Sequence, residues 1–214
     1  MRHFYKVALV LPLLGIAQSF AVESRQLSPG KPAEEPQHVK VVGISVLGSG
    51  CPKGTADVQV DTTGTLFEVT FSEYEVETGP DTMPKDWRKN CKLTINMEFT
   101  PGYQFSIVDT DMYGYAKIPA KVNGQCVNTY SFTGGGSDHV DFKLPLKGPY
   151  SGNFDLHSNP GISSYSPCGG STAILNMNTA CAISPTNLPA LIAVDHISGV
   201  LTVKFHLDWR PCPK

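Results

Sequence analysis

The sequence lacks a strong charge of either sign. Its 214 residues carry 17 Lys and Arg against 19 Asp and Glu, and the densest basic stretch is only Arg88, Lys89 and Lys92 beside Asp86. A protein that binds nucleic acid needs a basic stripe that neutralises phosphates. The composition therefore argues against a nucleic-acid partner.

Long hydrophobic runs are also scarce. The run Val7 to Ala17 is interrupted by a proline and is shorter than the roughly 20 apolar residues that a membrane helix needs. Basic residues precede it and small residues follow it, which is the pattern of a secretory signal peptide. We predict a signal peptide over residues 1–21 with cleavage after Ala21, cleavage after Ser19 being the alternative, and an exported protein without a membrane span.

The next segment, residues 22–38, has almost nothing to bury. It reads VESRQLSPGKPAEEPQH, and this richness in Pro, Glu, Gln and Ser is typical of disorder. We predict a disordered N-terminal arm here. Residues 39–214 contain no internal repeat and no second linker, and their length suits one domain with a substantial core.

Helical periodicity is essentially absent from residues 39–214. Apolar and polar residues alternate instead, which is the pattern of strands with one buried face and one wet face. The sequence DTTG, Asp61 to Gly64, has the chemistry of a hairpin turn. With 20 Gly and 17 Pro between short strands, we predict an all-β protein, an antiparallel β-sandwich of jelly-roll-like or Ig-like type. The alternation is clearest in Ala56–Val60, Phe67–Phe71, Val140–Leu146 and Leu201–Trp209.

The cysteines lack the CxxC spacing of a metal knuckle. In an oxidising compartment an even number of cysteines is normally read as a set of disulfides. The spacing alone does not select among the pairings. We expect disulfide participation of all six: Cys51, Cys91, Cys126, Cys168, Cys181 and Cys212.

Cys91 could instead be reactive, because it lies in the basic stretch WRKNCKL, where positive charge favours a thiolate. However, Cys91 is in phase with the apolar row from Leu93 to Phe99, whereas Lys92 and Glu98 are on the opposite face. We therefore predict that Cys91 is a structural, disulfide-bonded residue.

Catalytic motifs are missing as well. The stretch GISSYS lacks the spacing of a nucleophile elbow, and TGGGS lacks the lysine of a phosphate loop. The phase of the strands places His139, His157 and His206 on polar faces. Asp155 and His157 share a face, which could make half of a metal site, but two ligands are not a site.

Asp109 and Asp111 are the other candidates. They could supply oxygens to calcium, or one carboxylate of a glycosidase pair with an acid from Glu73 to Asp81. A turn in a solvated loop is the simpler interpretation. We accordingly expect no catalytic residue, no cofactor and no metal site.

Seven stretches together resemble a family of fungal secreted proteins of unknown function. The resemblance implies a small, exported, disulfide-bonded and mostly β protein without an established activity. The stretches are GSGCPKG (48–54), FEVTFSEY (67–74), RKNCKL (88–93), PGYQFSI (101–107), SPCGG (166–170), LNMNT (175–179) and LDWRPC (207–212).

The family pattern has four cysteines, which match Cys51, Cys91, Cys168 and Cys212. Cys126 and Cys181 are additional. If these two additional cysteines did not form a disulfide, the protein would keep two reactive thiols. The resemblance therefore leads us to predict that Cys126 and Cys181 pair with each other.

Three classes of function remain open. The first is a non-catalytic secreted protein that binds a cell-wall glycan or a host surface protein, as an effector or elicitor would, with the loops Glu73–Asn90 and Gly148–Gly170 as contact surfaces. The second is a carbohydrate-binding or carbohydrate-active sandwich. The third is a structural protein of a developmental body. No oligomeric state is indicated. Candidate sugar-stacking aromatics for the second class are Trp87, Tyr103, Tyr113, Tyr115, Tyr150 and Tyr165.

The sequence also lacks a site for N-linked glycosylation. No asparagine from Asn90 to Asn187 is followed two positions later by Ser or Thr. We expect the mass of the secreted protein to stay unchanged after treatment with an amidase that removes N-linked sugars. A loss of mass in that experiment would contradict the prediction.

Overall fold

The computed structural model describes residues 38–135, 138–161, 163–195 and 198–213. The predicted signal peptide, and all of the predicted arm except His38, lie outside the described residues. Their boundaries stay predictions.

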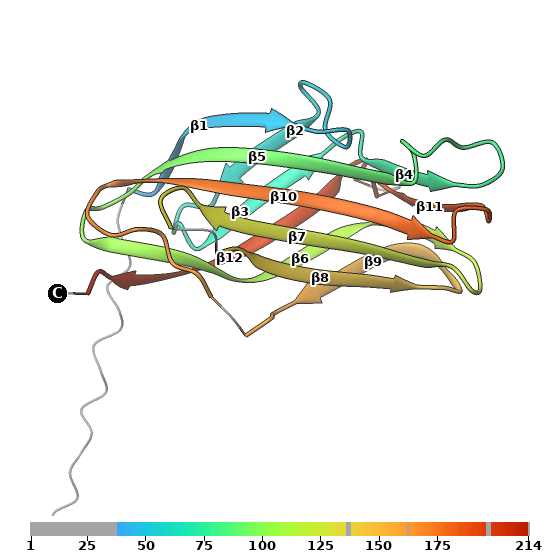
Figure 1. Cartoon of the computed structure of the whole chain (residues 1–214). Helices are drawn as coiled ribbons and strands as arrows, with labels where there is room; N and C mark the ends of the chain where they lie inside the picture. The colour runs from blue at the N-terminus through green and yellow to red at the C-terminus, as the bar shows by residue number, and fades with distance from the viewer. Residues whose placement is uncertain (1–37, 136–137, 162, 196–197, 214) are drawn as a thin grey trace, which may run out of the picture. The chain divides into compact units, whose positions relative to one another are not determined.

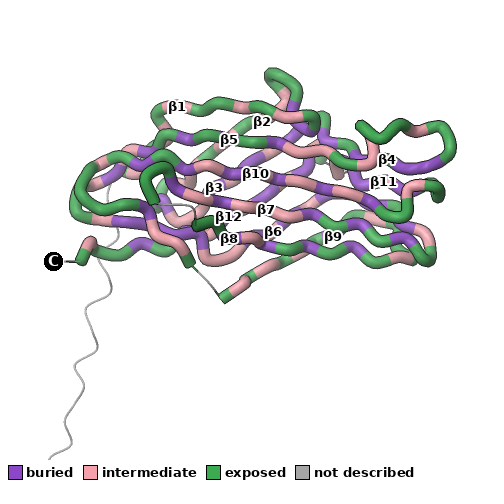
Figure 2. Tube along the Cα trace, viewed as in Figure 1, coloured by how far each residue is buried: buried purple, intermediate pink, exposed green. Residues whose placement is uncertain are grey.

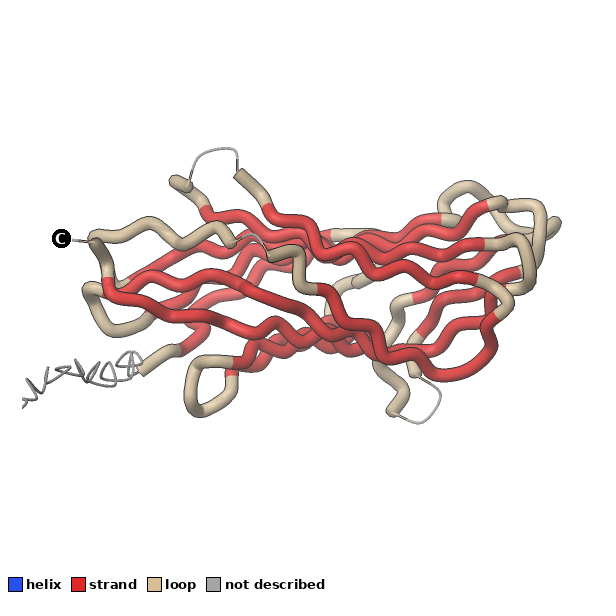
Figure 3. The backbone as a smooth tube through the Cα atoms, turned by 90° about the horizontal axis from the view of Figure 1, so that it is seen from below, coloured by secondary structure: helices blue, strands red, loops and turns tan. Residues whose placement is uncertain are grey.

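The described residues form two antiparallel sheets (Figures 1 and 3). The prediction of an all-β antiparallel sandwich is confirmed. The five-stranded sheet has the order β1 (Lys40–Leu47), β5 (Arg88–Glu98), β10 (Thr172–Ser184), β7 (Asn123–Phe132) and β8 (Val140–Lys147). The seven-stranded sheet contains β2 (Ala56–Val60), β3 (Leu66–Phe71), β12 (Leu201–Pro211), β6 (Tyr103–Ile118), β11 (Ala190–Ala193), β4 (Glu75–Thr78) and β9 (Tyr150–Ser158).

Strand β6 organises the seven-stranded sheet. One of its edges pairs with β12 along Tyr103–Tyr113 and then with β11 along Tyr115–Lys117, while β9 pairs with the other edge along Thr110–Ile118. Strands β3 and β2 follow β12 in order. The outer face of this sheet therefore runs across β2, β3, β12, β6 and β9.

The core lies between the two sheets because the central strands bury alternate side chains (Figure 2). The row Leu201 to Trp209 of β12 is buried at every second position, as the alternation predicts. Aromatic rings fill one end, where Trp209 lies 4.7 Å from Phe105 and 5.1 Å from Phe99 between ring centroids. Each such buried side chain stabilises the fold by about 1.5–3 kcal/mol.

Three disulfides link the described strands and loops. Cys91 is buried in phase with Leu93 and Ile95, as predicted, and bonds to Cys51 in the segment after β1. The other two bonds join Cys126 of β7 to Cys181 of β10, and Cys168 before β10 to Cys212 after β12. No cysteine in the described part of the chain is free.

Two segments expected to be long loops contain strands, so that expectation is wrong. Glu73–Asn90 contains β4, and Gly148–Gly170 contains β9. In the sequence only the shared polar face of Asp155 and His157 indicates β9, because β9 is an edge strand in which Phe154 is the only fully buried residue. Among the described residues, no helix is long and apolar enough to cross a membrane.

The turn predicted at Asp61 to Gly64 connects β2 and β3, and its carboxylate organises it. Asp61 Oδ1 accepts the backbone N–H groups of Thr65 and Leu66, both at 2.9 Å, and Oδ2 accepts the hydroxyl of Thr63. Partial burial raises the pKa of Asp61, but the hydrogen bonds outweigh burial and hold this pKa below its ordinary value of 3.8.

Replacing Asp61 by Asn should lower the free energy of unfolding by about 1–2 kcal/mol at neutral pH, because charge-assisted hydrogen bonds are lost. A carboxyl with a lowered folded pKa stabilises the fold above its unfolded pKa, and the effect disappears as pH falls through the folded value. The difference from wild type should therefore shrink in acid. Urea denaturation at pH 7 and pH 2.5 measures this, with Asp57→Asn on β2 as a control that changes stability by less than about 0.5 kcal/mol. Equal losses for both variants would contradict the interpretation.

Candidate functional site

A cluster of acidic and imidazole side chains lies on the outer face of the seven-stranded sheet. Asp109 and Asp111 belong to the 16-residue strand β6, so the interpretation of this segment as a turn in a loop is wrong. A bulge opposite His206 and Leu207 changes the phase of β6. Before it the odd-numbered Phe105 and Ile107 face the core, and after it the even-numbered residues do. The bulge therefore turns Asp109 and Asp111 outward.

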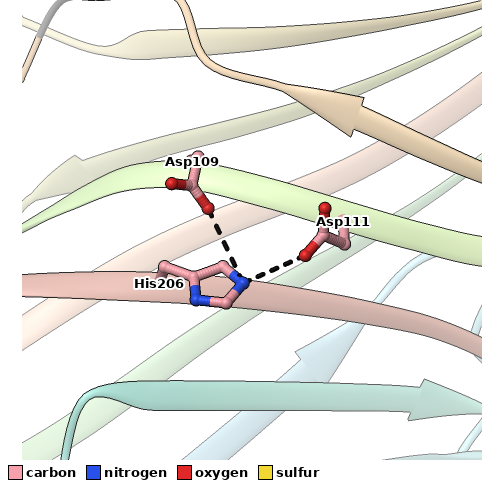
Figure 4. A group of neighbouring side chains, drawn as sticks. All are labelled: Asp109, Asp111 and His206. Atoms are coloured by element: carbon pink, nitrogen blue, oxygen red, sulfur yellow. Dashed lines mark hydrogen bonds and ion pairs between the residues drawn. The ribbon is translucent and has the colours of Figure 1, made fainter.

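Strand pairing brings two histidines to these carboxylates. His157 of β9 is directly opposite Asp111, and His206 of β12 is opposite Asp109. Nδ1 of His157 lies 2.8 Å from Oδ1 of Asp111, and Nε2 of His206 lies 3.0 Å from Oδ2 of the same residue. The Nε2 atom is also 3.6 Å from Oδ1 of Asp109 (Figure 4). One carboxylate thus contacts two imidazoles, and one imidazole nitrogen contacts two carboxylates.

The carboxylates are less accessible than the histidines. The exposed side-chain fraction is 20% for Asp111 and 23% for Asp109, against 43% for His206 and 59% for His157. Partial burial raises the pKa of Asp111, but the hydrogen bonds to His157 and His206 outweigh it and place the pKa below the ordinary value. The hydrogen bond to Asp111 raises the pKa of His157. The cluster therefore favours charged Asp111 and protonated His157.

An aromatic and charged surface continues from the cluster along the same face. Tyr113 follows Asp111 outward on β6 and lies opposite Asp155 of β9. Lys204 of β12 places Nζ 5.4 Å from the centroid of the Tyr113 ring and 3.6 Å from Oε2 of Glu68 on β3. Burial, and then the negative charges of Asp111, Asp155 and Glu68, raise the pKa of Tyr113. Positively and negatively charged side chains, both able to form hydrogen bonds, thus border the Tyr113 ring.

Of the glycosidase pairings considered from the sequence, the one between Asp111 and Glu75 does not form. Tyr115 of β6 is the register partner of Ala193 on β11, and Ala193 is in turn the register partner of Glu75 on β4. Asp111 is four residues from Tyr115, and Glu75 is two strands away, so standard strand spacings separate the two carboxylates by about 16 Å. Carboxyl groups in inverting glycosidases are only about 6.5–9.5 Å apart.

The six candidate aromatics do not gather on one face. Tyr113 and Tyr115 share the outer face of β6. Tyr165 packs against Arg210, 3.4 Å from ring centroid to Cζ, and its hydroxyl contacts Asp208. The others lie apart: Tyr103 packs against the core, Trp87 donates from Nε1 to the hydroxyl of Thr82, and Tyr150 is exposed in β9.

The outer face of the five-stranded sheet has a different character. Around its central groove, which Lys92 also lines, it carries hydroxyl and amide groups, such as Thr94, whose hydroxyl donates to Oδ1 of Asn176 at 3.2 Å. Nδ2 of Asn176 in turn donates to Thr133 at 2.9 Å. These groups are hydrogen-bonded to one another along a shallow groove of about 250 Å³. This face can therefore serve as a control surface in binding experiments on the outer face of β12, β6 and β9.

The comparison with protein families decides the identity of the chain. The model of the Domain of unknown function (DUF4360) matches residues 37–212. The chain belongs to the DUF4360 family. An uncharacterized secreted protein of Arthroderma benhamiae is 30% identical to this DUF4360 chain over 187 residues, which cover 86% of the chain and 76% of the relative. The resemblance to a secreted fungal family of unknown function is confirmed at that level, and the DUF4360 protein is secreted.

One solved structure, TmCBM61 in complex with beta-1,4-galactotriose, matches this chain with a low score. The match covers 80% of this DUF4360 chain and 90% of that chain, with 9% sequence identity and a TM-score of 0.29. A score this low supports no conclusion about function.

The sequence indicates every member of the cluster but not the cluster itself. Asp109 and Asp111 stand out as one candidate pair, His157 as a partner of Asp155, and His206 only as a histidine on a polar strand face. The missing information is the order in which β9, β6 and β12 pair. The only local signal was the alternate spacing of Asp109 and Asp111.

Proposed function

We propose that this DUF4360 protein is a non-catalytic extracellular binding protein that recognises a polyhydroxylated ligand, such as a cell-wall glycan. The recognition surface is the outer face of β12, β6 and β9. The observation that carries the proposal is the ring of Tyr113 bordered by Asp155, Lys204 and the Asp111 cluster, all on paired strands.

The chemistry of this surface suits sugar rings. An aromatic ring offers a flat apolar contact, and the neighbouring carboxylates and ammonium group can accept and donate hydrogen bonds to hydroxyl groups. Hydrogen bonds to charged groups contribute about 1.5–3 kcal/mol each. Because the side chains stand on paired strands of one sheet, the backbone fixes their relative positions before a ligand binds.

The electrostatics of the cluster argue against Asp111 as the general acid of a glycosidase. A general acid in a glycosidase needs a raised pKa so that it holds a proton at neutral pH. Asp111 has the opposite shift, since hydrogen bonds from two histidines lower its pKa. The carboxylate is therefore suited to accept hydrogen bonds and unsuited to donate a proton.

Co-sedimentation with insoluble glucan, chitin, mannan and galactan tests the proposal. We expect saturable binding to at least one polymer, weakened about 10-fold by Tyr113→Ala, which corresponds to the loss of a ring contact of about 1.4 kcal/mol. Tyr150→Ala is the matched control, since Tyr150 is exposed on β9 but out of phase with the proposed surface. No reducing ends should be released.

Three results would count against this function. These are the release of sugars, equal loss in both variants, and no binding to any polymer. A host surface protein, as for an effector or elicitor, is the alternative partner, and the same two variants apply to it. No particular residue of this surface favours that alternative or a developmental role.

A further inference from the structure

We infer that Asp109, Asp111 and His206 form a binding site for a divalent transition-metal ion such as Zn²⁺. Each residue offers one ligand atom, and these three atoms all lie within 4.8 Å of one another. They come from adjacent strands of one sheet (Figure 4). The inference does not depend on glycan binding.

The spacing of the ligand atoms matches a coordination sphere. A metal ion about 2.1 Å from each nitrogen or oxygen ligand holds neighbouring ligand atoms about 3.0 Å apart in octahedral geometry and about 3.4 Å apart in tetrahedral geometry. Nε2 of His206 is 3.0 Å from Oδ2 of Asp111 and 3.6 Å from Oδ1 of Asp109. The two carboxylate oxygens lie within 4.8 Å of each other, so side-chain movements of at most about 2 Å bring all three ligand atoms to coordination distances.

The ligand types select the class of ion. Ca²⁺ and Mg²⁺ take oxygen ligands, whereas imidazole suits Zn²⁺ and other first-row transition metals. A site of one imidazole and two carboxylates combines both donor types, which Zn²⁺ accepts. Three protein ligands leave at least one position for water or for an oxygen atom of another molecule.

The surroundings of the three ligands also fit a metal site. Oδ1 of Asp111, the oxygen that does not face His206, contacts Nδ1 of His157 at 2.8 Å. A hydrogen bond of this kind orients a ligating carboxylate, and its loss typically weakens metal affinity by about 10–100-fold. We assign His157 a positioning role and His206 the role of a direct ligand.

Charge balance gives the ion its driving force. Two carboxylates converge on one imidazole nitrogen, which can carry a single proton. A divalent cation in place of that proton compensates both carboxylates at once. The β6 bulge keeps Asp109 and Asp111 on the same side of the sheet as His206. Folding of the sheet therefore brings the three ligands together before an ion binds.

Isothermal titration of the tag-free mature protein, treated with EDTA and then freed of it, tests the inference with ZnCl₂. We expect one ion per chain for wild type and no saturable binding for His206→Ala or Asp111→Asn. His157→Gln should bind about 10–100-fold more weakly than wild type. His139→Ala, an exposed histidine before β8, should bind like wild type. CaCl₂ should bind more weakly than ZnCl₂.

Thermal melts of each metal-free variant confirm that it is folded, and Zn²⁺ should raise the melting temperature of wild type by mass action but not that of His206→Ala. Absence of saturable Zn²⁺ binding to wild type would overturn the inference. So would unchanged affinity in folded His206→Ala and Asp111→Asn. The titration contains no glycan, so its failure is distinct from a failure of the proposed binding function.

Discussion

The double variant Cys126→Ala/Cys181→Ala should lose about 4 kcal/mol of unfolding free energy. The bond closes a loop with a sequence separation of 55 residues, and the chain-entropy account assigns about 4 kcal/mol to a loop of this size. Both cysteines are buried, at 0% and 1% exposure, so lost packing of the sulfur atoms adds to the effect. Urea denaturation of wild type and variant measures the difference.

The control is Cys168→Ala/Cys212→Ala. Its loop has a sequence separation of 44 residues, and the chain-entropy account gives nearly the same loss for it, about 4 kcal/mol. Cys168 is exposed and Cys212 is half-buried, so little packing is lost. We expect the buried pair to be the more damaging of the two. A loss below about 1 kcal/mol for the buried pair would contradict the prediction, as would reaction of the denatured, unreduced wild type with a thiol reagent.

Replacing Tyr74 should produce the second large effect. Its hydroxyl lies 2.9 Å from the carbonyl oxygen of Lys89 and accepts the backbone N–H of Cys181 at 3.2 Å. The hydroxyl thereby joins β5 and β10 from inside the core. Burial raises its pKa, because the charged form would lose its hydration. A Cβ atom at Gly50 would lie only 2.4 Å from the Tyr74 ring, so the backbone of that loop packs directly on the tyrosine.

We expect Tyr74→Phe to cost about 1–3 kcal/mol, because buried backbone groups lose their hydrogen bonds to the hydroxyl. Tyr74→Ala should cost about 3–5 kcal/mol, because it also opens a cavity. Thermal and urea denaturation measure both values. A Tyr74→Phe variant within about 0.5 kcal/mol of wild type would show that the hydroxyl is not structurally important.

The strands that sequence analysis predicted are those in which every second residue is apolar and buried. Strand β12 and the second half of β5 are examples, and the phase of Cys91 in β5 identified it as a structural residue. Strand β6 was missed at its centre because the bulge changes its phase and because Thr110 and Gly114 occupy inward positions. Alternation is a rule about regular pairing, and it fails where pairing is irregular.

The cluster was beyond sequence analysis for a different reason. His157 and His206 are separated from Asp111 by 46 and 95 positions, and only the order of the strands makes them neighbours. The cysteines show the same limit. The resemblance suggested the pair Cys126 and Cys181, but sequence spacing left the partners of the other four open.

Mapping of ligand contacts by NMR tests most directly whether the outer face of β12, β6 and β9 is the recognition surface. The protein would be titrated with soluble oligosaccharides of the polymer that it binds. The account predicts amide shift changes concentrated at Tyr113, Asp155 and Lys204, with little change around Thr94 and Asn176 on the five-stranded sheet. Shift changes centred on Thr94 and Asn176, with none near Tyr113, would contradict it.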